Sequence, residues 1–157
     1  MKYIRIFSIF FIIILFTGCS NNSKSSEKVI TCSLSTVNKN NNYELNATYK
    51  IYANNDIVNK VITEEIITSS NDEILNYFQE YLNKTYKESN EKYSGYDYKV
   101  TKKNNKVTSS VKIDYNKMNL EKSVSDSKEL KAYVNKDNKM TVDGIKNIYT
   151  SMGAVCE

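Results

Sequence analysis

The chain has 157 residues, with 22 lysines and arginines against 18 aspartates and glutamates, so its formal net charge is only +4. So small a net charge gives no electrostatic case for nucleic acid as a partner. The chain contains no histidine, which excludes histidine-based catalytic triads and removes the commonest zinc and copper ligand.

The N-terminal segment has the pattern of a bacterial lipoprotein signal peptide. Two cations precede a run, residues 6–16, that is apolar except for Ser8, and two small residues then lead into Cys19. The run holds 11 residues (16 − 6 + 1), whereas a membrane-spanning helix needs about 20. A transmembrane helix is therefore disfavoured. A signal peptide without lipid remains the alternative, because Phe16 stands where a lipobox usually has leucine.

We predict that residues 1–18 are removed and that Cys19 then carries a diacylglycerol. Two acyl chains hold a protein stably on a bilayer, since each buried methylene contributes about 0.8 kcal/mol. The expected location is the extracytoplasmic face of the cell membrane. Residues 19–28 are almost entirely polar and predict a flexible tether. Residues 29–157 are long enough for a single domain.

The first half of this domain predicts three antiparallel strands. Residues 29–37 are a mixture of β-branched and polar residues, and residues 43–53 alternate between apolar and polar side chains. That period of two is typical of a strand with one buried and one solvated face. Residues 57–68 follow as a third strand. Asparagine-rich turns at 39–42 and 54–56 separate the three.

A helix and a second hairpin come next. Residues 70–73 match a capping box with Ser70 as the N-cap, and apolar side chains follow at helical spacing to about Ser89. This spacing places Tyr81 on the buried face of the helix with Ile74, Phe78 and Leu82. Residues 96–102 and 106–115 then predict a hairpin.

The last part of the chain predicts a closing helix. Residues 116–138 are polar, with helical turns expected around 118–122 and 127–133. Thr141 is the predicted N-cap of the last helix, and Gly153 ends it. Its expected buried face consists of Val142, Ile145, Tyr149 and Met152. The predicted fold class is α+β, with an antiparallel sheet of about five strands and two helices packed on one face.

Two cysteines remain after Cys19 is assigned to the lipid. Cys32 and Cys156 lie 124 positions apart near the two ends of the domain. An exported chain reaches an environment where disulfides persist, and two cysteines can pair in only one way. The alternative is two free thiols, which low-redox cell surfaces also allow.

Several short stretches lie in a recognisable order along the chain. They are Thr31-Cys32, Tyr49-Lys50-Ile51-Tyr52, Asn54-Asn55-Asp56 with residues 57–61, Asn105-Lys106-Val107-Thr108, residues 113–120, and Ser151-Met152-Gly153-Ala154-Val155-Cys156. In this order they resemble the YehR-like family of small bacterial lipoproteins, a group of uncharacterised function. The resemblance implies the fold, the lipid on Cys19 and a Cys32–Cys156 disulfide. It implies no catalytic residue.

The sequence offers little for catalysis or metal binding. Glu64 and Glu65 are adjacent in a predicted strand, so their side chains point to opposite faces and cannot act as a pair. A Ser–Lys dyad is formally possible, but both residue types are too abundant for a match to carry weight. Asp137, Asn138 and Asp143 lack the spacing of a calcium loop and are better explained as a solvated turn. We expect no enzyme activity, metal or cofactor.

The tyrosines form the most suggestive group of side chains. Six of them cluster in the predicted helix, the second hairpin and the segment that joins the two: Tyr77, Tyr81, Tyr86, Tyr93, Tyr96 and Tyr98. Tyrosine provides flat amphipathic contact area, which suits recognition of sugar, peptide or protein. Covering the sheet is the simpler alternative. Of the six, Tyr77, Tyr93 and Tyr96 are expected to be the most exposed and to form a recognition surface.

Two functional hypotheses follow from these features. In the first, the protein is a non-enzymatic binding module, anchored to the membrane through Cys19, for a protein or cell-envelope component. In the second, it holds a small ligand in a cavity between helix and sheet. A binding module needs an exposed aromatic or apolar patch, whereas a ligand binder needs a cavity of roughly 300 Å³ or more.

Overall fold

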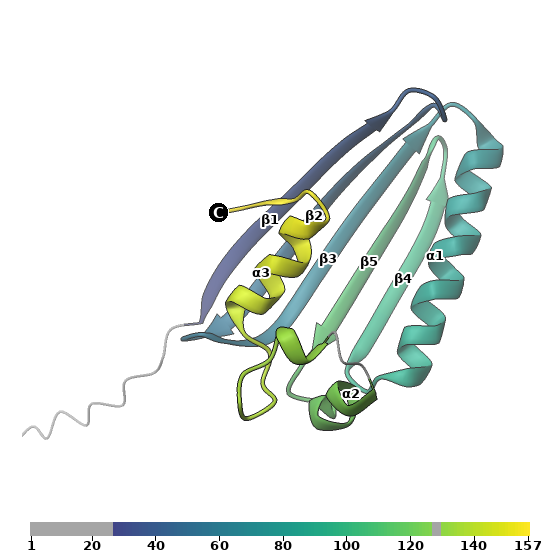
Figure 1. Ribbon diagram of the computed structural model, residues 1–157. Coiled ribbons are helices and arrows are strands. Elements are labelled where there is room, and N and C mark those ends of the chain that lie inside the picture. Colours follow the sequence, from purple (N-terminus) through teal and green to yellow (C-terminus); the bar gives the residue numbers. More distant parts are fainter. Residues whose placement is uncertain (1–26, 127–129) are drawn as a thin grey trace, which may run out of the picture.

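A computed structural model describes residues 27–126 and 130–157 (Figure 1). The predicted signal peptide, Cys19 and most of the predicted tether lie outside these residues. The elements in chain order are β1 (Lys28–Asn38), β2 (Tyr43–Asn54), β3 (Ile57–Ser69), α1 (Asp72–Lys92), β4 (Tyr96–Lys103), β5 (Lys106–Asp114), α2 (Leu120–Asp126), a 3₁₀ turn (Leu130–Ala132), α3 (Val142–Ser151) and β6 (Val155–Cys156).

The strands form one sheet in the order β4-β5-β3-β2-β1-β6, and every neighbouring pair is antiparallel. The predicted α+β fold class is therefore confirmed, with one short strand more than expected. Asn42, Asn55 and Asn104 close the three hairpins with positive φ angles of 52°, 55° and 54°. Asparagine tolerates this conformation better than most residues, which explains the asparagine-rich turns. Within the described residues, no helix is long and apolar enough to cross a membrane.

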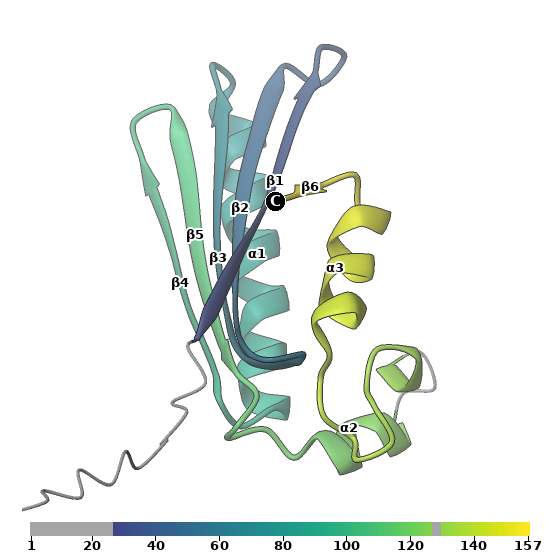
Figure 2. The same ribbon diagram turned by 90° about the vertical axis from the view of Figure 1, so that its left-hand side faces the viewer.

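Helices α1 and α3 lie on the same face of the sheet (Figure 2). The alternation along β2 shows why. Tyr43 and Leu45 pack into the cluster under α1, and Tyr49 and Ile51 face α3. The opposite face is largely polar, with Lys50 exposed, as expected for an antiparallel sheet with one solvated side. The prediction of two helices on one face is confirmed, and α2 lies beyond the end of the sheet (Figure 1).

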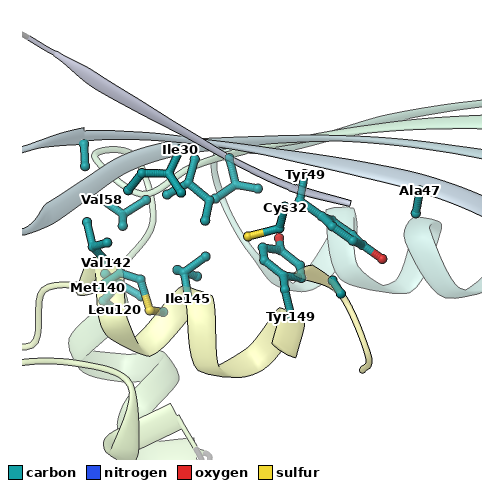
Figure 3. Packing of buried hydrophobic residues seen from close by; sticks show 14 residues of the cluster. Ile30, Cys32, Ala47, Tyr49, Val58, Leu120, Met140, Val142, Ile145 and Tyr149 are labelled. Carbon is teal, nitrogen blue, oxygen red and sulfur yellow. The ribbon is translucent and has the colours of Figure 1, made fainter. Parts of the chain in front are cut away.

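The apolar interior consists of two clusters along the covered face. In the cluster that includes α3, Ile51, Val61 and Ile145 are buried. The rings of Tyr49 and Tyr149 stack with centroids 4.0 Å apart, and Figure 3 shows the two rings side by side. The second cluster lies under α1 and is formed by Ile67, Leu75, Leu82 and Val107. Each helix therefore covers its own part of the sheet.

The helix caps agree with the sequence in part. Thr141 caps α3 as predicted, since its Oγ1 accepts a hydrogen bond of 3.0 Å from the Gly144 N–H. For α1 the prediction is wrong by one residue: Asn71 is the N-cap, and its Oδ1 accepts the Glu73 N–H at 2.9 Å. Ser70 instead accepts a hydrogen bond from the Asn42 amide, at 2.7 Å.

Met152 is 56 % exposed, so its predicted place in the core is wrong. Helix α3 ends at Ser151, and Gly153 then adopts a φ of +94° that turns the chain toward the sheet. Beyond the end of the helix, the helical spacing no longer decides where a side chain points.

Strand β6 follows this turn and joins the edge of β1. Cys32 and Cys156 are direct cross-strand neighbours and form a disulfide. Beside them, Thr31 and Glu157 exchange two backbone hydrogen bonds, of 3.2 and 2.9 Å. The disulfide therefore fixes the C-terminus against the first strand of the sheet.

Candidate functional site

Two tyrosines on the N-terminal half of α1 form the most exposed aromatic group. Tyr77 is 62 % exposed and Tyr81 is 52 % exposed. Because they are four residues apart on a helix, they lie on the same side of it. Their rings are nearly parallel, at 12°, with centroids 6.0 Å apart. They present a flat aromatic area to solvent.

Other side chains fix this pair to the core. Phe78 contacts Tyr77 edge to face with centroids 5.5 Å apart, and it contacts Tyr43 of β2 in the same way at 4.9 Å. A shallow hollow of about 580 Å³ runs between them and is lined by Asn41, Tyr43, Glu73, Ile74, Tyr77, Phe78 and Tyr81. We name the five apolar and aromatic members of this set the aromatic surface. They are Tyr43, Ile74, Tyr77, Phe78 and Tyr81.

The aromatic surface is suited to contact rather than to chemistry. Its rings offer apolar faces, its phenol groups can donate or accept hydrogen bonds, and Asn41 and Glu73 add polar groups at the border. Aromatic rings held by a packed core lose little conformational entropy on binding. Such a surface can therefore hold a partner without a deep pocket.

The helical spacing predicted that Tyr81 is buried, but the structure places this side chain on the surface. The buried stripe of α1 follows Leu75 and Leu82. At about 100° per residue, Tyr81 lies about 120° around the helix from Leu75. The spacing from Ile74 and Phe78 was correct for a helix, but it did not locate the centre of the buried stripe. That position depends on where β3, β4 and β5 lie.

A second group of tyrosines is structural. The ring of Tyr86 lies 6.4 Å from that of Tyr96 and 6.0 Å from that of Tyr98, measured between centroids. The Tyr86 hydroxyl donates a 2.5 Å hydrogen bond to Glu65 Oε2, and the buried Ser109 hydroxyl donates one of 2.7 Å to the same oxygen. Burial, followed by the charge of Glu65, raises the pKa of Tyr86, which keeps this phenol a neutral donor.

The predicted separation of Glu64 and Glu65 is confirmed: Glu64 is exposed, and Glu65 lies on the covered face of the sheet. Its hydrogen bonds link β3 to α1 and β5. Both donors engage one oxygen of this half-buried carboxylate, as expected for a charge that neighbours satisfy. Glu65 therefore connects elements of the fold. The sequence signal was only a glutamate at an inward strand position.

Tyr93 and Tyr96 do not join Tyr77 in one surface. Both are half-buried, so their predicted exposure is wrong, while that of Tyr77 is correct. The Lys92 ammonium lies 4.9 Å from the Tyr93 ring centroid. Burial raises the pKa of Tyr96 to about 12, although a hydrogen bond with Ser89 opposes the shift. Sixteen residues of mostly helical chain place Tyr93 about 24 Å from Tyr77 along the axis.

An apolar cavity of about 170 Å³ lies between the end of α1, the sheet and α3. Tyr93 and Tyr96 line one side of it, and Leu130, Met140 and Ile148 line another. Small-molecule sites usually enclose about 300–1,000 Å³. This cavity is therefore small for a ligand between helix and sheet.

The turn that contains Asp137 and Asn138 is organised by an amide. Asn135 Oδ1 accepts the backbone N–H groups of Asp137 and Lys139, both at 2.9 Å. Asn138 has a positive φ of 55°, and Asp143 is exposed in the first turn of α3. In the part of the chain that the structure describes, no three histidine, cysteine or acidic side chains lie close enough to hold a metal ion.

Comparison with solved structures finds the same fold in two bacterial proteins. The NMR structure of E. coli YehR matches with a TM-score of 0.51 at 16 % identity, over 83 % of this chain and 92 % of that chain. The NMR structure of a protein from Streptococcus pneumoniae TIGR4 matches with a TM-score of 0.50 at 13 % identity, over 100 % and 97 %. No family model and no curated protein matches the sequence. The chain has a YehR-like fold.

Proposed function

We propose that this protein is a lipid-anchored binding module on the extracytoplasmic face of a bacterial membrane. Its anchor is a diacylglycerol on Cys19, and its partner is a protein or a component of the cell envelope. We also propose that the chain is a member of the YehR-like family of small lipoproteins. The N-terminal pattern, the YehR-like fold and the Cys32–Cys156 disulfide support this assignment.

The aromatic surface carries the functional proposal. Tyr77 and Tyr81 are large side chains that gain contact area when a partner covers them, and Phe78 already holds Tyr77 in place from below. Exposed aromatic groups of this kind mark interaction sites more often than isolated apolar side chains do. The open shape of the hollow suits a macromolecular surface or an extended polymer.

Two observations favour binding over the alternatives. The apolar cavity beside Tyr93 is smaller than usual small-ligand sites, and the hollow of about 580 Å³ beside Tyr77, although within their size range, is open to solvent. The Glu65 carboxylate on the covered face accepts hydrogen bonds from Tyr86 and Ser109, which tie it to structural neighbours. The surface pair Tyr77 and Tyr81 is thus the better place for function.

The anchor is tested by fractionation of cells that express the full chain. The wild-type protein should sediment with membranes. A Cys19→Ser variant should move to the soluble fraction or remain as unprocessed precursor, since no thiol is left to accept the lipid. Membrane retention of a processed Cys19→Ser protein would contradict lipid anchoring. Metabolic labelling with a fatty acid provides the direct measurement.

The binding surface is tested by chemical cross-linking on intact cells, with neighbours identified by mass spectrometry. A specific neighbour should be lost in a Tyr77→Ala, Tyr81→Ala double variant and retained in a Tyr93→Ala control. Thermal unfolding of all three proteins verifies that they are folded. Loss with Tyr93→Ala alone would move the site to the other end of α1. An unchanged neighbour in the double variant would contradict the proposal.

A further inference from the structure

The two edges of the sheet differ in how they are protected. Strand β4 forms one edge, and four of its eight residues are charged, namely Asp97, Lys99, Lys102 and Lys103. Helix α1 also runs alongside it (Figure 1). Charged side chains on an edge strand, and lysine above all, discourage the addition of another strand. This edge is therefore protected.

The opposite edge is β1, and β6 covers only a small part of it. β6 pairs with Cys32 and Ser33, and Glu157 extends the pairing to Thr31. The following residues of β1, Leu34–Asn38, pair with β2 on one side. On their other side, no strand of the described chain lies against them. About 17 Å of strand edge is thus open, at roughly 3.4 Å per residue.

The backbone of this open edge is oriented for pairing. In an antiparallel sheet, successive residues direct their N–H and C=O groups to alternate neighbours. Thr31 bonds to Glu157, so the residues with odd numbers face outward. Ser35 and Val37 therefore direct two N–H and two C=O groups away from the sheet. β6 demonstrates that the same edge accepts an antiparallel strand.

The side chains around the open edge also favour a strand. Leu34–Asn38 contains no charged residue. Lys39 follows it, and Glu44 lies opposite Val37 on β2, so the local charges cancel. Val37 is 62 % exposed and Val155 of β6 is 69 % exposed, and both flank the position that an added strand would occupy on the open face. On the covered face, Gly153 lies close to Leu34 and beside the exposed Met152.

We propose that the Leu34–Asn38 edge is a second docking site, which binds an extended, uncharged segment of a partner protein by β-strand addition. Main-chain hydrogen bonds to Ser35 and Val37 supply the attachment. Threonine and valine are suitable side chains for the partner segment, because they favour strands and would cover Val37 and Val155 of this chain in the complex. This site adjoins the aromatic surface at Asn38, which pairs with Tyr43 and donates a hydrogen bond of 3.4 Å to its hydroxyl. It uses different groups, the outward backbone of Ser35 and Val37, and does not depend on the function proposed for the aromatic surface.

A second copy of this chain is a poorer occupant. Two such edges can pair only over the same five residues, with Leu34 opposite Asn38 and Ser35 opposite Val37. A contact of this length buries far less than the roughly 800 Å² per partner that stable interfaces need. In addition, the apolar Leu34 side chain of one copy would lie opposite the polar Asn38 amide of the other. A partner segment can choose its own side chains and is free of this constraint.

The test uses amide hydrogen exchange of the full chain, purified in detergent and labelled with ¹⁵N. The probe is a nine-residue peptide with alternating threonine and valine in its centre and one lysine at each end. In the free protein, the Ser35 and Val37 amides should exchange quickly, while that of Thr36, which faces β2, should be protected. With peptide at ten times its Kd, exchange at Ser35 and Val37 should slow about 11-fold.

Two matched variants separate backbone from side-chain effects. Val37→Pro removes the outward N–H and should weaken peptide binding about tenfold or more. Val37→Ala keeps the N–H and should bind within a few-fold of the wild type. If Val37→Pro does not fold, Ser35→Pro tests the same point. A Tyr77→Ala, Tyr81→Ala double variant should bind the peptide normally, which separates this site from the aromatic surface.

Several outcomes would overturn the proposal. These are protection of Ser35 and Val37 in the free monomer, no slowing of exchange with millimolar peptide, or slowing on β4 instead. Protection that rises with protein concentration in the absence of peptide would show self-association and would also refute a heterologous partner. Equal binding by Val37→Pro and Val37→Ala would refute main-chain recognition.

Discussion

Reduction of the Cys32–Cys156 disulfide should lower the free energy of unfolding substantially. The bridge joins residues 124 positions apart, which is nearly the whole domain. Closing a loop of that size restricts the unfolded chain by about 5 kcal/mol in the chain-entropy model. Measured values for small secreted domains are about 2–5 kcal/mol, because the reduced unfolded state keeps some structure.

The native state should lose little when the bridge opens. Cys32 is fully buried, and α3 is held independently by Ile145 and Tyr149 in the core. We therefore expect a loss of about 3–5 kcal/mol, in the upper part of the usual range. The bridge ties β6, which has two residues, directly to β1, and the backbone hydrogen bonds between Thr31 and Glu157 also hold it there.

The assay is urea denaturation at pH 7 and 25 °C, with and without a phosphine reductant. The midpoint should fall on reduction, and the slope m should rise because the reduced unfolded chain is more expanded. A Cys32→Ala, Cys156→Ala double variant is the control, since the reductant should not change its unfolding. A difference below about 1 kcal/mol between the oxidised and reduced wild type would refute the reasoning from loop closure.

Two further predictions concern the core around α3. Gly144→Ala should destabilise the protein by about 1–3 kcal/mol, even though alanine is the better helix former, because the new Cβ would collide with the Tyr133 carbonyl; a thermal midpoint equal to that of the wild type would contradict this. Burial raises the pKa of Tyr149 from 10 to about 12. The raised pKa means that the neutral Tyr149 phenol contributes about 3 kcal/mol at most to the free energy of unfolding. This contribution should be complete below pH 10 and should fall as the pH rises toward 12, because the tyrosine of the unfolded chain loses its proton first. Urea midpoints from pH 8 to 11 measure this loss, and a Tyr149→Phe variant that declines as steeply as the wild type would assign it to other groups.

Much of the local structure could be predicted because it depends on residues close together in the chain. The period-two pattern of residues 43–53 located β2, the asparagines located the hairpin turns, and Thr141 located the start of α3. Each of these signals is a short-range preference of the backbone or of a side chain for its immediate neighbours. The number of cysteines also restricted the disulfide to a single pairing in the domain.

The exposed side of each element was decided by the tertiary structure. Tyr81 has the spacing of a core residue, yet the position of the sheet under α1 leaves it in solvent beside Tyr77. Glutamate is a residue type usually found at the surface, yet Glu65 accepts hydrogen bonds from Tyr86 and Ser109 on the covered face of the sheet. Packing between distant segments determines these outcomes, and no local pattern contains that information.

The sequence by itself determined the five long strands, the two long helices, the hairpin turns and the pattern of the N-terminal segment. The strand order, the two-residue strand β6 and the open edge at Leu34–Asn38 became visible only in the tertiary structure. The physical reason is the distance along the chain over which each kind of signal acts. Periodicity and turn chemistry act over a few residues, whereas an edge strand is defined by the absence of a neighbour, which depends on where every other described strand has paired.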